Sequence, residues 1–435
     1  MRHSRSRKLM LAGAGIAVFL LGSSAVSRLA RRFAGSPRLL SVEEVPDSTE
    51  CYRPVGAETK VSFSSTHNLF SDFGEDSVQA QAGGGTVNLD RPPVRVLRDT
   101  APIYSSVAVD DKNNEVFLQD NNLWSIRVFS RLDNAKPGEP PTEARRVIMG
   151  NNTEVQFNSC VFVDPANGDV YSVENDIGDV IVTFAHDATG DAKPVRRLRV
   201  THRAYAMAID EENQEFFVSV QHPPQIAVYR KGASGNEQPK RLLIGEKTQL
   251  SDSHGMAIDP KRKLLFVNNW GNIADDAVPG SGRFGPPSIT VYPLDANGDE
   301  APLRIIQGPR TGLDWPGAMS IDADTGDLYV ANDMGQAIIA FHGTDQGDIA
   351  PARVIKGAKT GLSYPVGVFV DSPNKEVWAS NIGNSTATVY PVMANGDVAP
   401  LRVIRSAEDG KRSLRFGKTQ ALAYDSTREQ ILVPN

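Results

Sequence analysis

The sequence has little of several residue types on which whole classes of protein depend. Its 435 residues contain two cysteines, Cys51 and Cys160, which are too few for a disulfide-framed small domain. Charged residues make up 23% of the chain and the formal net charge is −6, so neither a wholly disordered chain nor a broadly basic nucleic-acid-binding protein is expected. The glycines follow no three-residue period, which excludes a collagen-like fibre.

The short patterns that identify common catalytic sites are also absent from the sequence. It contains no Gly-x-Ser-x-Gly nucleophile elbow, phosphate-binding loop, Cys-x-x-Cys-His haem site or His-Glu-x-x-His zinc pattern. Any function therefore has to be inferred from where individual side chains fall in the fold.

The first 27 residues have the composition of an export signal. Four basic residues lie within positions 2–8, and an apolar stretch interrupted only by small residues follows from Leu9 to Val26. Residues 1–27 therefore predict a signal peptide or an uncleaved signal anchor, and the sequence leaves both forms open. Either form predicts an exported protein that is periplasmic, secreted or anchored by this segment, with no other attachment to a membrane.

The rest of the chain divides into a linker and one domain. Residues 28–85 show no steady hydrophobic period and are predicted to be a flexible N-terminal extension. Residues 86–435 are predicted to form a single domain, which we expect to be a monomer. Removal of the signal with its four basic residues would change the net charge from −6 to −10 (−6 − 4), which disfavours binding to nucleic acid or anionic lipid.

From residue 86 onward the sequence repeats. Residues 301–317 and 350–366 share the pattern Ala-Pro-x-Arg-x-Ile-x-Gly, Thr-Gly-Leu and Pro at an offset of 49 residues (350 − 301). An arginine and an aspartate that ends a short apolar run alternate seven times along the chain. The arginines are Arg95, Arg146, Arg197, Arg241, Arg304, Arg353 and Arg402. The aspartates are Asp110, Asp164, Asp210, Asp259, Asp322, Asp371 and Asp425. This period is typical of four-stranded propeller blades.

The repeat predicts an all-β fold, a seven-bladed β-propeller of four-stranded antiparallel blades. Each repeat contains four short β-branched or aromatic runs bounded by turn residues. The last repeat ends at a second strand, 431–433, and the segments Thr86–Leu89 and Val94–Leu97 offer the two missing strands. Pairing of the two termini in a blade of two plus two strands would close the ring. Six blades are the alternative count.

Because the arginines and aspartates recur in every blade, we expect the aspartate to close a turn and the arginine to pair with it or with a neighbouring acid.

The repeated elements resemble the bacterial NHL-type propeller repeats. The resemblance rests on Gly-Asp, Ala-Pro-x-Arg-x-Ile-x-Gly, Thr-Gly-Leu, Pro and a strand such as Leu328–Asn332, and it covers about 340 residues. It implies the propeller architecture. It leaves the biochemical task open, because such propellers include binding scaffolds, lactonases and lyases. Many members have six blades, in agreement with the alternative count.

The candidate site lies on the face where the loops between second and third strands, and between fourth and first strands, emerge. The residues five positions before the aspartates are irregular there, although the neighbouring positions are regular. They are Ser105, Ser159, Tyr205, His254, Gly317, Val366 and Gln420. Three histidines map to this face in adjacent repeats, and neutral imidazoles can bind zinc or act as a general base. They are His202, His222 and His254.

Further candidate residues lie in the loops of the same face. Trp270 and Trp315 could form an aromatic platform, and residues 270–288 form an insertion between a second and a third strand. Asn269, Asn332 and Asn381 follow second strands, where they could bind a ligand or cap a turn.

Two functions follow from this pattern. The leading prediction is an exported, non-catalytic scaffold that binds a protein or a small ligand at Tyr205, Gln420 and the histidines, tryptophans and asparagines of the loop-rich channel face. The alternative is a metal-assisted lyase or hydrolase in which His202, His222 and His254 bind a divalent ion. No cofactor is required by the first prediction, and zinc or calcium is the cofactor implied by the second. Cys160 is predicted to be a buried free thiol rather than the partner of Cys51.

Overall fold

The computed structural model describes residues 97, 104–110, 112–120, 123–135, 139–274, 278–384, 386–404, 423–425 and 430–432. All of them belong to one compact unit, residues 68–435. The predicted signal segment 1–27 and the predicted linker 28–85 lie outside the described residues, as do Cys51 and Gln420. Nowhere in the described part of the chain is there a helix with the length and apolar character of a membrane span.

Six four-stranded antiparallel sheets follow one another along the chain, and we number them blades 1 to 6. Blade 1 contains β1 (Tyr104–Asp110), β2 (Glu115–Asp120), β3 (Ser125–Ser130) and β4 (Arg146–Ile148). Blade 2 contains β5 (Asn158–Val163), β6 (Val170–Glu174), β7 (Val180–Phe184) and β8 (Arg196–Arg199). Blade 3 contains β9 (Ala204–Asp210), β10 (Glu215–Val220), β11 (Gln225–Arg230) and β12 (Arg241–Ile244).

The remaining blades have the same order of strands. Blade 4 contains β13 (Ser253–Asp259), β14 (Leu264–Asn269), β17 (Ser288–Pro293) and β18 (Arg304–Gln307). Blade 5 contains β19 (Pro316–Ile321), β20 (Leu328–Asn332), β21 (Ala337–Phe341) and β22 (Arg353–Ile355). Blade 6 contains β23 (Pro365–Asp371), β24 (Glu376–Asn381), β25 (Thr386–Pro391) and β26 (Arg402–Ile404). Two short 3-10 turns, η2 (Glu246–Thr248) and η3 (Pro309–Thr311), follow the fourth strands of blades 3 and 4.

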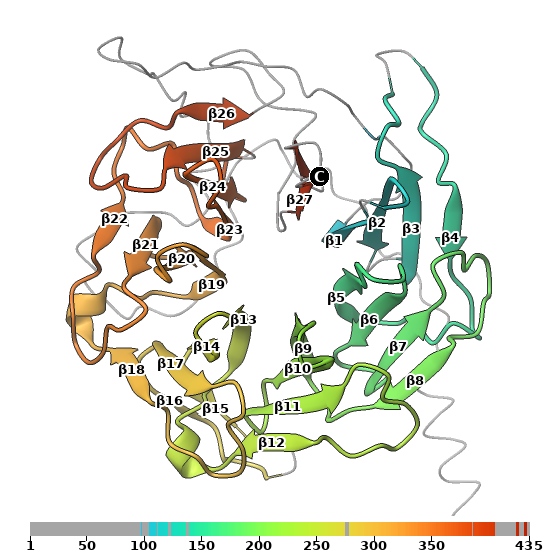
Figure 1. Cartoon of the computed structure of the whole chain (residues 1–435), viewed down its shortest axis with the longest axis horizontal. Helices are drawn as coiled ribbons and strands as arrows, with labels where there is room; N and C mark the ends of the chain where they lie inside the picture. Colours follow the sequence, from blue (N-terminus) through green and yellow to red (C-terminus); the bar gives the residue numbers. More distant parts are fainter. Residues whose placement is uncertain are drawn as a thin grey trace, which may run out of the picture. The chain divides into compact units, whose positions relative to one another are not determined.

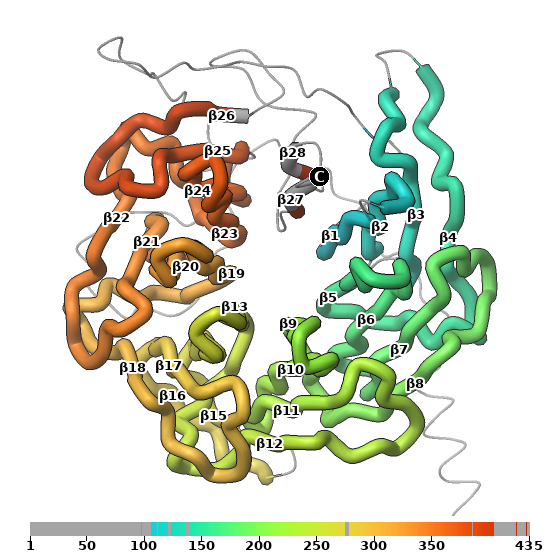
Figure 2. The backbone as a smooth tube through the Cα atoms, viewed as in Figure 1, coloured from blue at the N-terminus to red at the C-terminus, as the bar shows by residue number. Residues whose placement is uncertain are grey.

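The blades are arranged around a common axis, as a β-propeller requires (Figure 1; Figure 2). The first strand of each blade is innermost and the fourth is outermost. Each first strand contacts the first strand of the next blade, in the order β1, β5, β9, β13, β19 and β23. The predicted all-β propeller with four-stranded antiparallel blades is therefore confirmed.

The predicted number of complete blades is wrong. The described residues form six four-stranded blades, the alternative count, rather than seven. After blade 6 the chain forms only a two-stranded sheet, of β27 (Ala423–Asp425) and β28 (Gln430–Leu432), and β27 contacts β1. The strands predicted to complete this sheet, Thr86–Leu89 and Val94–Leu97, lie outside the described residues apart from Leu97. The repeat pattern predicts the strands of each blade, but the seventh copy of the repeat supplies only two described strands.

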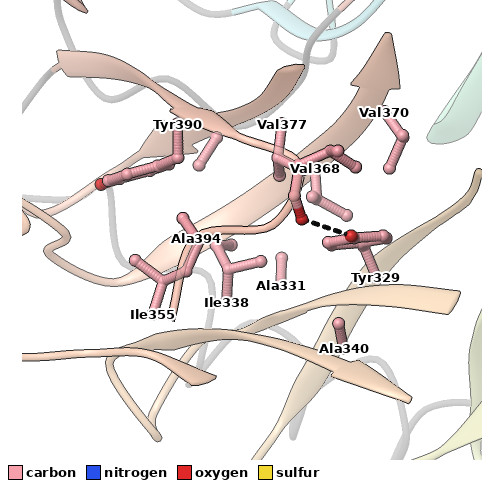
Figure 3. Packing of buried hydrophobic residues seen from close by; sticks show 12 residues of the cluster. Tyr329, Ala331, Ile338, Ala340, Ile355, Val368, Val370, Val377, Tyr390 and Ala394 are labelled. Atoms are coloured by element: carbon pink, nitrogen blue, oxygen red, sulfur yellow. Dashed lines mark hydrogen bonds between the residues drawn. The ribbon is translucent and has the colours of Figure 1, made fainter. Parts of the chain in front are cut away.

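The apolar core lies between neighbouring blades. Between blades 5 and 6, Tyr329, Ile338, Val368 and Tyr390 belong to one buried cluster (Figure 3). The Tyr329 hydroxyl lies at this interface and donates a hydrogen bond to the carbonyl oxygen of Val392, 2.6 Å away. Burial of each large side chain of this kind contributes about 1.5–3 kcal/mol, so packing between the sheets holds the ring together.

A latch of backbone and side-chain hydrogen bonds joins the outer edges of successive blades. In blades 2 to 6 a glycine in the turn between third and fourth strands forms a parallel bridge to the fourth strand of the preceding blade. The bridges join Ile148 to Gly190, Leu198 to Gly235, Leu243 to Gly298, Ile306 to Gly347, and Ile355 to Gly396. In four of these turns the next residue is an aspartate, and it accepts a hydrogen bond of 2.7 Å from a backbone N–H in the preceding loop. We call this unit the blade latch. It explains why Gly-Asp recurs in the repeat, because these turns serve the neighbouring blade as well as their own.

An arginine of the fourth strand lies over an aromatic ring of the second strand in five blades. The pairs are Arg146 with Phe117, Arg196 with Tyr171, Arg241 with Phe217, Arg353 with Tyr329, and Arg402 with Trp378. Each arginine also forms an ion pair with an acid two residues before the ring. The predicted structural role of the arginines is therefore confirmed for these blades. In blade 2 the repeat pattern predicts Arg197, but Arg196 faces Asp169 and Arg197 pairs with Glu154 instead.

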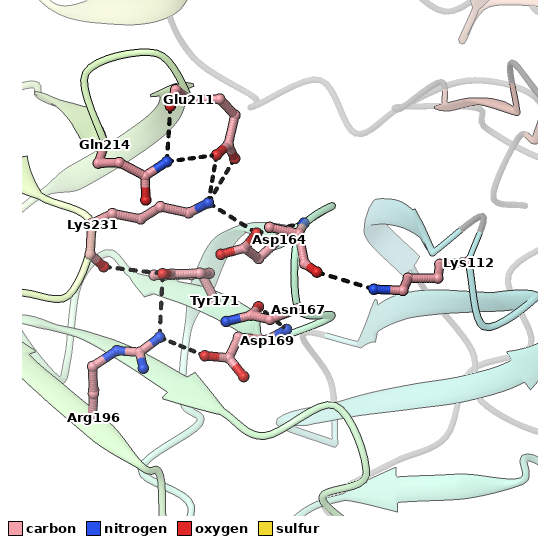
Figure 4. Close-up of polar contacts among 10 residues, drawn as sticks. Lys112, Asp164, Asn167, Asp169, Tyr171, Arg196, Glu211, Gln214 and Lys231 are labelled. Carbon is pink, nitrogen blue, oxygen red and sulfur yellow. Dashed lines mark hydrogen bonds and ion pairs between the residues drawn. The ribbon is translucent and has the colours of Figure 1, made fainter.

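The aspartates that end the first strands close the turn to the second strand, as predicted. Asp210 Oδ1, for example, accepts a hydrogen bond from the Asn213 backbone N–H, 3.2 Å away. In blade 2 the equivalent Asp164 also joins two blades, because its Oδ1 lies 2.9 Å from Lys231 Nζ of blade 3 (Figure 4). Lys231 lies 2.6 Å from Glu211 as well, so two acids share one buried ammonium group.

Cys160 lies in β5 and forms no disulfide. Burial raises the pKa of its thiol to about 12. The thiol is therefore protonated at neutral pH and is a poor nucleophile, as expected for a cysteine of an inner strand.

Candidate functional site

Two loop positions form a regular backbone frame on one face of blades 2 to 6. The first position directly precedes the first strand and the second directly follows the second strand. In each of these blades the carbonyl oxygen of the first residue accepts a hydrogen bond of 2.9–3.2 Å from the N–H of the second. The bonded pairs are Phe157 with Asn175, Arg203 with Gln221, Asp252 with Trp270, Trp315 with Asp333, and Tyr364 with Ile382. The backbone is therefore constant while the side chains differ, which is how propellers present chemistry on a fixed scaffold.

Buried side chains hold this frame in place. Asn269, Asn332 and Asn381 end the second strands of blades 4 to 6, and each accepts a hydrogen bond from the backbone N–H of the residue 18 positions earlier, in the loop before the first strand. Each amide nitrogen donates a hydrogen bond within its own blade. All three side chains are buried. The structure thus places these three predicted site residues beneath the loops, where they position backbone.

The irregular column of the sequence coincides with a β-bulge at the start of each first strand. In blade 3 the register between β9 and β10 shifts between Ala204 and Met207, and in blade 4 the register between β13 and β14 shifts between Ser253 and Met256. Tyr205 and His254 lie within these shifts. A bulge turns its side chain out of the regular alternation, which explains why these positions do not follow the small-residue pattern of their neighbours.

Four aromatic rings from blades 3, 4 and 5 contact one another in a row that we call the aromatic stack, in which the two outer pairs are stacked and the central pair, His254 and Trp270, is tilted by 45°. The ring centroids are 4.5 Å apart for Tyr205 and His254, 3.6 Å for His254 and Trp270, and 4.7 Å for Trp270 and Trp315. Trp270 Nε1 donates a hydrogen bond to the Pro316 carbonyl oxygen at 2.8 Å, which fixes its orientation. The stack ends on Trp315, which is 51% exposed. The predicted pair of tryptophans therefore stacks, and it does so as part of a larger aromatic group.

A polar group centred on Asp252 lies against this stack. Asp252 Oδ1 lies 2.9 Å from His254 Nε2 and 3.2 Å from the Gln221 amide nitrogen. His222 Nε2 is 4.0 Å from the same oxygen and 3.5 Å from the Asn272 amide nitrogen. The side chains of Asp252, His222 and His254 are only about one tenth exposed, so the carboxylate is largely removed from water.

A hydrogen-bond relay fixes how the Gln221 amide is turned. The Asn175 amide nitrogen donates to the Ala204 carbonyl oxygen at 2.7 Å and to Gln221 Oε1 at 3.3 Å. Because Gln221 Oε1 faces this donor, its amide nitrogen faces Asp252 and lies 2.5 Å from His254 Nε2. Blade 2 therefore helps to position a ring that belongs to blade 4.

The three predicted histidines are not brought together. His222 and His254 share Asp252, whereas His202 Nδ1 pairs with Asp179 Oδ1 at 2.7 Å and its side chain is 43% exposed. In the described part of the chain no group of three or more His, Cys, Asp or Glu side chains is placed to hold a metal ion. The predicted zinc or calcium site stays a prediction.

Sequence reasoning missed the acidic and amide members of the site. Gln221 and Asp252 occupy the two frame positions of blades 3 and 4, and Asp333 occupies one in blade 5. Burial, with repulsion from Asp314 next to Trp315, raises the pKa of Asp333 to about 6. The signals that could have found them are two variable positions of the repeat: the one seven residues before each aspartate, which holds Asp252, and the one eleven residues after it, which holds Gln221 and Asp333.

The predicted insertion lies between the second and third strands of blade 4. It contains a short hairpin of β15 (Asn272–Ile273) and β16 (Arg283–Phe284), whose Asn272 amide contacts His222. Phe284 is 87% exposed. The insertion thus supplies one contact to the polar group.

No protein-family model matches the chain, and no curated protein matches it.

Proposed function

We propose that the protein is an exported binding scaffold that recognises a ligand at the loop-rich face of blades 3 to 5. The observation that carries this proposal is the aromatic stack, in which Tyr205, His254, Trp270 and Trp315 come from three blades and end on a half-exposed indole. Ligand sites combine such apolar surfaces with a few positioned polar groups, and Asp252 and Gln221 are polar groups of this kind. The NHL-type resemblance agrees with a scaffold that carries its function in its loops.

The metal-assisted lyase or hydrolase has less support. It needs a set of ligands around one ion, and His202 is engaged with Asp179 in blade 2. His254 Nε2 is engaged with Asp252 and Gln221. The aromatic stack, by contrast, needs no rearrangement to present Trp315 to a ligand.

Closure of the ring by both chain ends is part of the proposal. Blade 1 contains a buried cluster of Val107, Val116, Leu118 and Phe129. Three residues from the two ends of the chain pack against it: Leu97, Ala423 and Leu432. This shared packing supports a closing sheet built from the segment before β1 together with β27 and β28. An experimental structure that shows Thr86–Leu89 beside these strands would test it.

Ligand binding at the stack can be tested with a defined mixture of small probes. We expect saturation-transfer NMR with methyl α-glucoside, phenol, choline, hexanoate and acetyl-phenylalaninamide to show at least one binder. Trp315→Ala removes the exposed end of the stack and should weaken that binder by about 5-fold or more, because an aromatic contact contributes about 1 kcal/mol or more beyond its buried area.

Trp124→Ala is the matched control. Trp124 is 48% exposed and has φ of 52°, close to the 51% exposure and φ of 49° of Trp315, but it lies in blade 1. Binding should survive in this variant. Saturation transfer that is equal in wild type and Trp315→Ala for every probe would argue against a site at the stack.

A further inference from the structure

We infer that the ligand of the aromatic stack carries an alkylammonium group, which lies against Trp315 beside Asp314 and Asp333. This inference rests on the proposed function, since it names the chemistry of the ligand at the same site. It starts from the exposed end of the stack and from the charges that flank it.

The aromatic end of the site offers a π face to solvent. Trp315 stacks on Trp270 at 4.7 Å with an angle of 28° between the rings, so the indole is supported from behind by a second ring. Half of Trp315 remains exposed, whereas Trp270 is partly covered. The face of a tryptophan attracts cations more strongly than that of any other side chain, and an ammonium group binds within about 6 Å of the ring centre.

Two acidic residues adjoin Trp315: Asp314 is its neighbour in the sequence, and Asp333 is its partner in the backbone hydrogen bond described above. Asp314 directly precedes Trp315, and its backbone N–H donates to Asn332 Oδ1 at 2.7 Å. Asp333 follows Asn332, and its backbone N–H donates to the Trp315 carbonyl oxygen at 3.2 Å. These two bonds fix the backbone of both acids in the two loops that meet at Trp315.

The two carboxylates have no counterion among the described residues. Among the described residues, no ion pair involves the exposed Asp314 or the partly buried Asp333, whereas the five acids that face the fourth-strand arginines are all paired. Asp333 Oδ1 is buried and forms no hydrogen bond. A buried carboxylate oxygen without a partner costs free energy, which a cationic ligand would recover.

The negative charge of Asp314 and Asp333 favours an ammonium group over a neutral sugar as the ligand. A sugar would also stack on an indole, but it would leave the repulsion between Asp314 and Asp333 in place. An ammonium group reduces that repulsion and uses the π face at the same time. The net charge of −6 adds a weak attraction for cations over longer distances.

Two matched pairs of probes test the inference by isothermal titration of the full chain. Choline is compared with its uncharged isostere 3,3-dimethyl-1-butanol, and acetyl-lysinamide is compared with acetyl-norleucinamide. We expect each cation to bind at least about tenfold more tightly than its neutral partner. Choline binding stronger than lysine binding would indicate a free small amine as the natural ligand, and the reverse would indicate the side chain of a protein partner.

Variants locate the binding. Trp315→Ala should weaken the preferred cation by about 5- to 30-fold. Asp333→Asn keeps the shape of the side chain and should weaken the cation while leaving the neutral isostere unchanged, and the effect should shrink at high salt. Trp124→Ala should bind the cation like wild type. Melting curves check that each variant is folded.

Different failures overturn different claims. Equal binding of cation and isostere, or binding of methyl α-glucoside alone, would overturn the ammonium inference. The proposed function would still stand if Trp315→Ala abolished the binding of that compound. Cation binding that persists in both Trp315→Ala and Asp333→Asn would place the cation elsewhere and overturn the inference. If no compound of either probe set depends on Trp315, the proposed function falls as well.

Discussion

Gly308→Ala is expected to lower the free energy of unfolding by about 3–4 kcal/mol. Gly308 ends the fourth strand of blade 4 with φ of 132° and ψ of 169°, a backbone conformation that only glycine adopts readily. A Cβ atom there would lie 2.5 Å from Asp348 Cγ and 2.7 Å from Asp348 Cβ. Urea unfolding followed by circular dichroism measures the loss.

The loss has two parts because Asp348 belongs to the blade latch. Its Oδ1 accepts a hydrogen bond of 2.7 Å from the Arg310 backbone N–H, and the preceding Gly347 bridges to Ile306. The new methyl group would displace the carboxylate from this bond, and the strained backbone adds its own contribution. Three other blades have the same arrangement, at Gly150, Gly245 and Gly357.

Two comparisons separate the latch from a general effect of removing glycine. Gly312→Ala lies in the same loop with φ of 67°, but its Cβ would meet nothing within 4 Å, so it should cost only about 1 kcal/mol. Asp348→Ala should destabilise the wild type by about 1 kcal/mol and the Gly308→Ala variant by almost nothing, since the bond is already lost there. Additive losses in the double variant would contradict the latch.

The strands and their order could be predicted from the sequence because each depends on a local pattern. Short β-branched runs, a terminal aspartate and glycine-rich turns recur in every blade, so errors in one repeat are corrected by the others. The two halves of the blade latch, Gly-Asp and Arg-x-Ile-x-Gly, are both visible in the repeat, but their pairing between blades was not predicted. The number of complete blades was wrong because the described residues after blade 6 form only the two-stranded sheet of β27 and β28.

The site could be predicted only in part, for a physical reason. Tyr205 and His254 stand out because they occupy bulges where the other blades have small or apolar residues. Trp270 and Trp315 stand out by residue type. Asp252 and Gln221 do not, because acids and amides are common in surface loops, and these two meet only because blades 3 and 4 bring together loops 31 residues apart. The sequence could not show that His202 pairs with Asp179 instead of approaching His222 and His254.

The second large effect concerns Glu174, the last residue of β6. Glu174 is fully buried and takes the place that Asn269, Asn332 and Asn381 hold in blades 4 to 6. Its Oε2 accepts a hydrogen bond of 2.7 Å from the Gln156 backbone N–H, and its Oε1 lies 3.1 Å from the Ser172 hydroxyl. Burial, with a smaller contribution from the nearby Glu154, raises the pKa of this carboxyl group from its usual value near 4.5 to about 8.

Glu174 therefore makes the stability of the protein depend on pH. Above about pH 4.5 the unfolded chain loses the proton of this residue, while the folded protein keeps it until about pH 8. The contribution is fully present below pH 4.5 and is lost as the pH rises through 8. A shift of this size corresponds to a loss of about 3–5 kcal/mol between pH 4 and pH 9.

Glu174→Gln should remove this dependence, because glutamine keeps the shape of the side chain and stays neutral at every pH, as the asparagines of the other blades do. Relative to wild type, we expect the variant to be equally stable or slightly less stable at pH 4–5 and more stable by about 3–5 kcal/mol at pH 9, measured by urea unfolding at each pH. Glu143→Gln, at an exposed position of blade 1, should leave the pH profile of wild type unchanged. If the difference in unfolding free energy between Glu174→Gln and wild type were constant from pH 4 to pH 9, the carboxyl group would be ionised in the folded protein. The loop of blade 2 would then tolerate a buried charge where blades 4 to 6 have an amide.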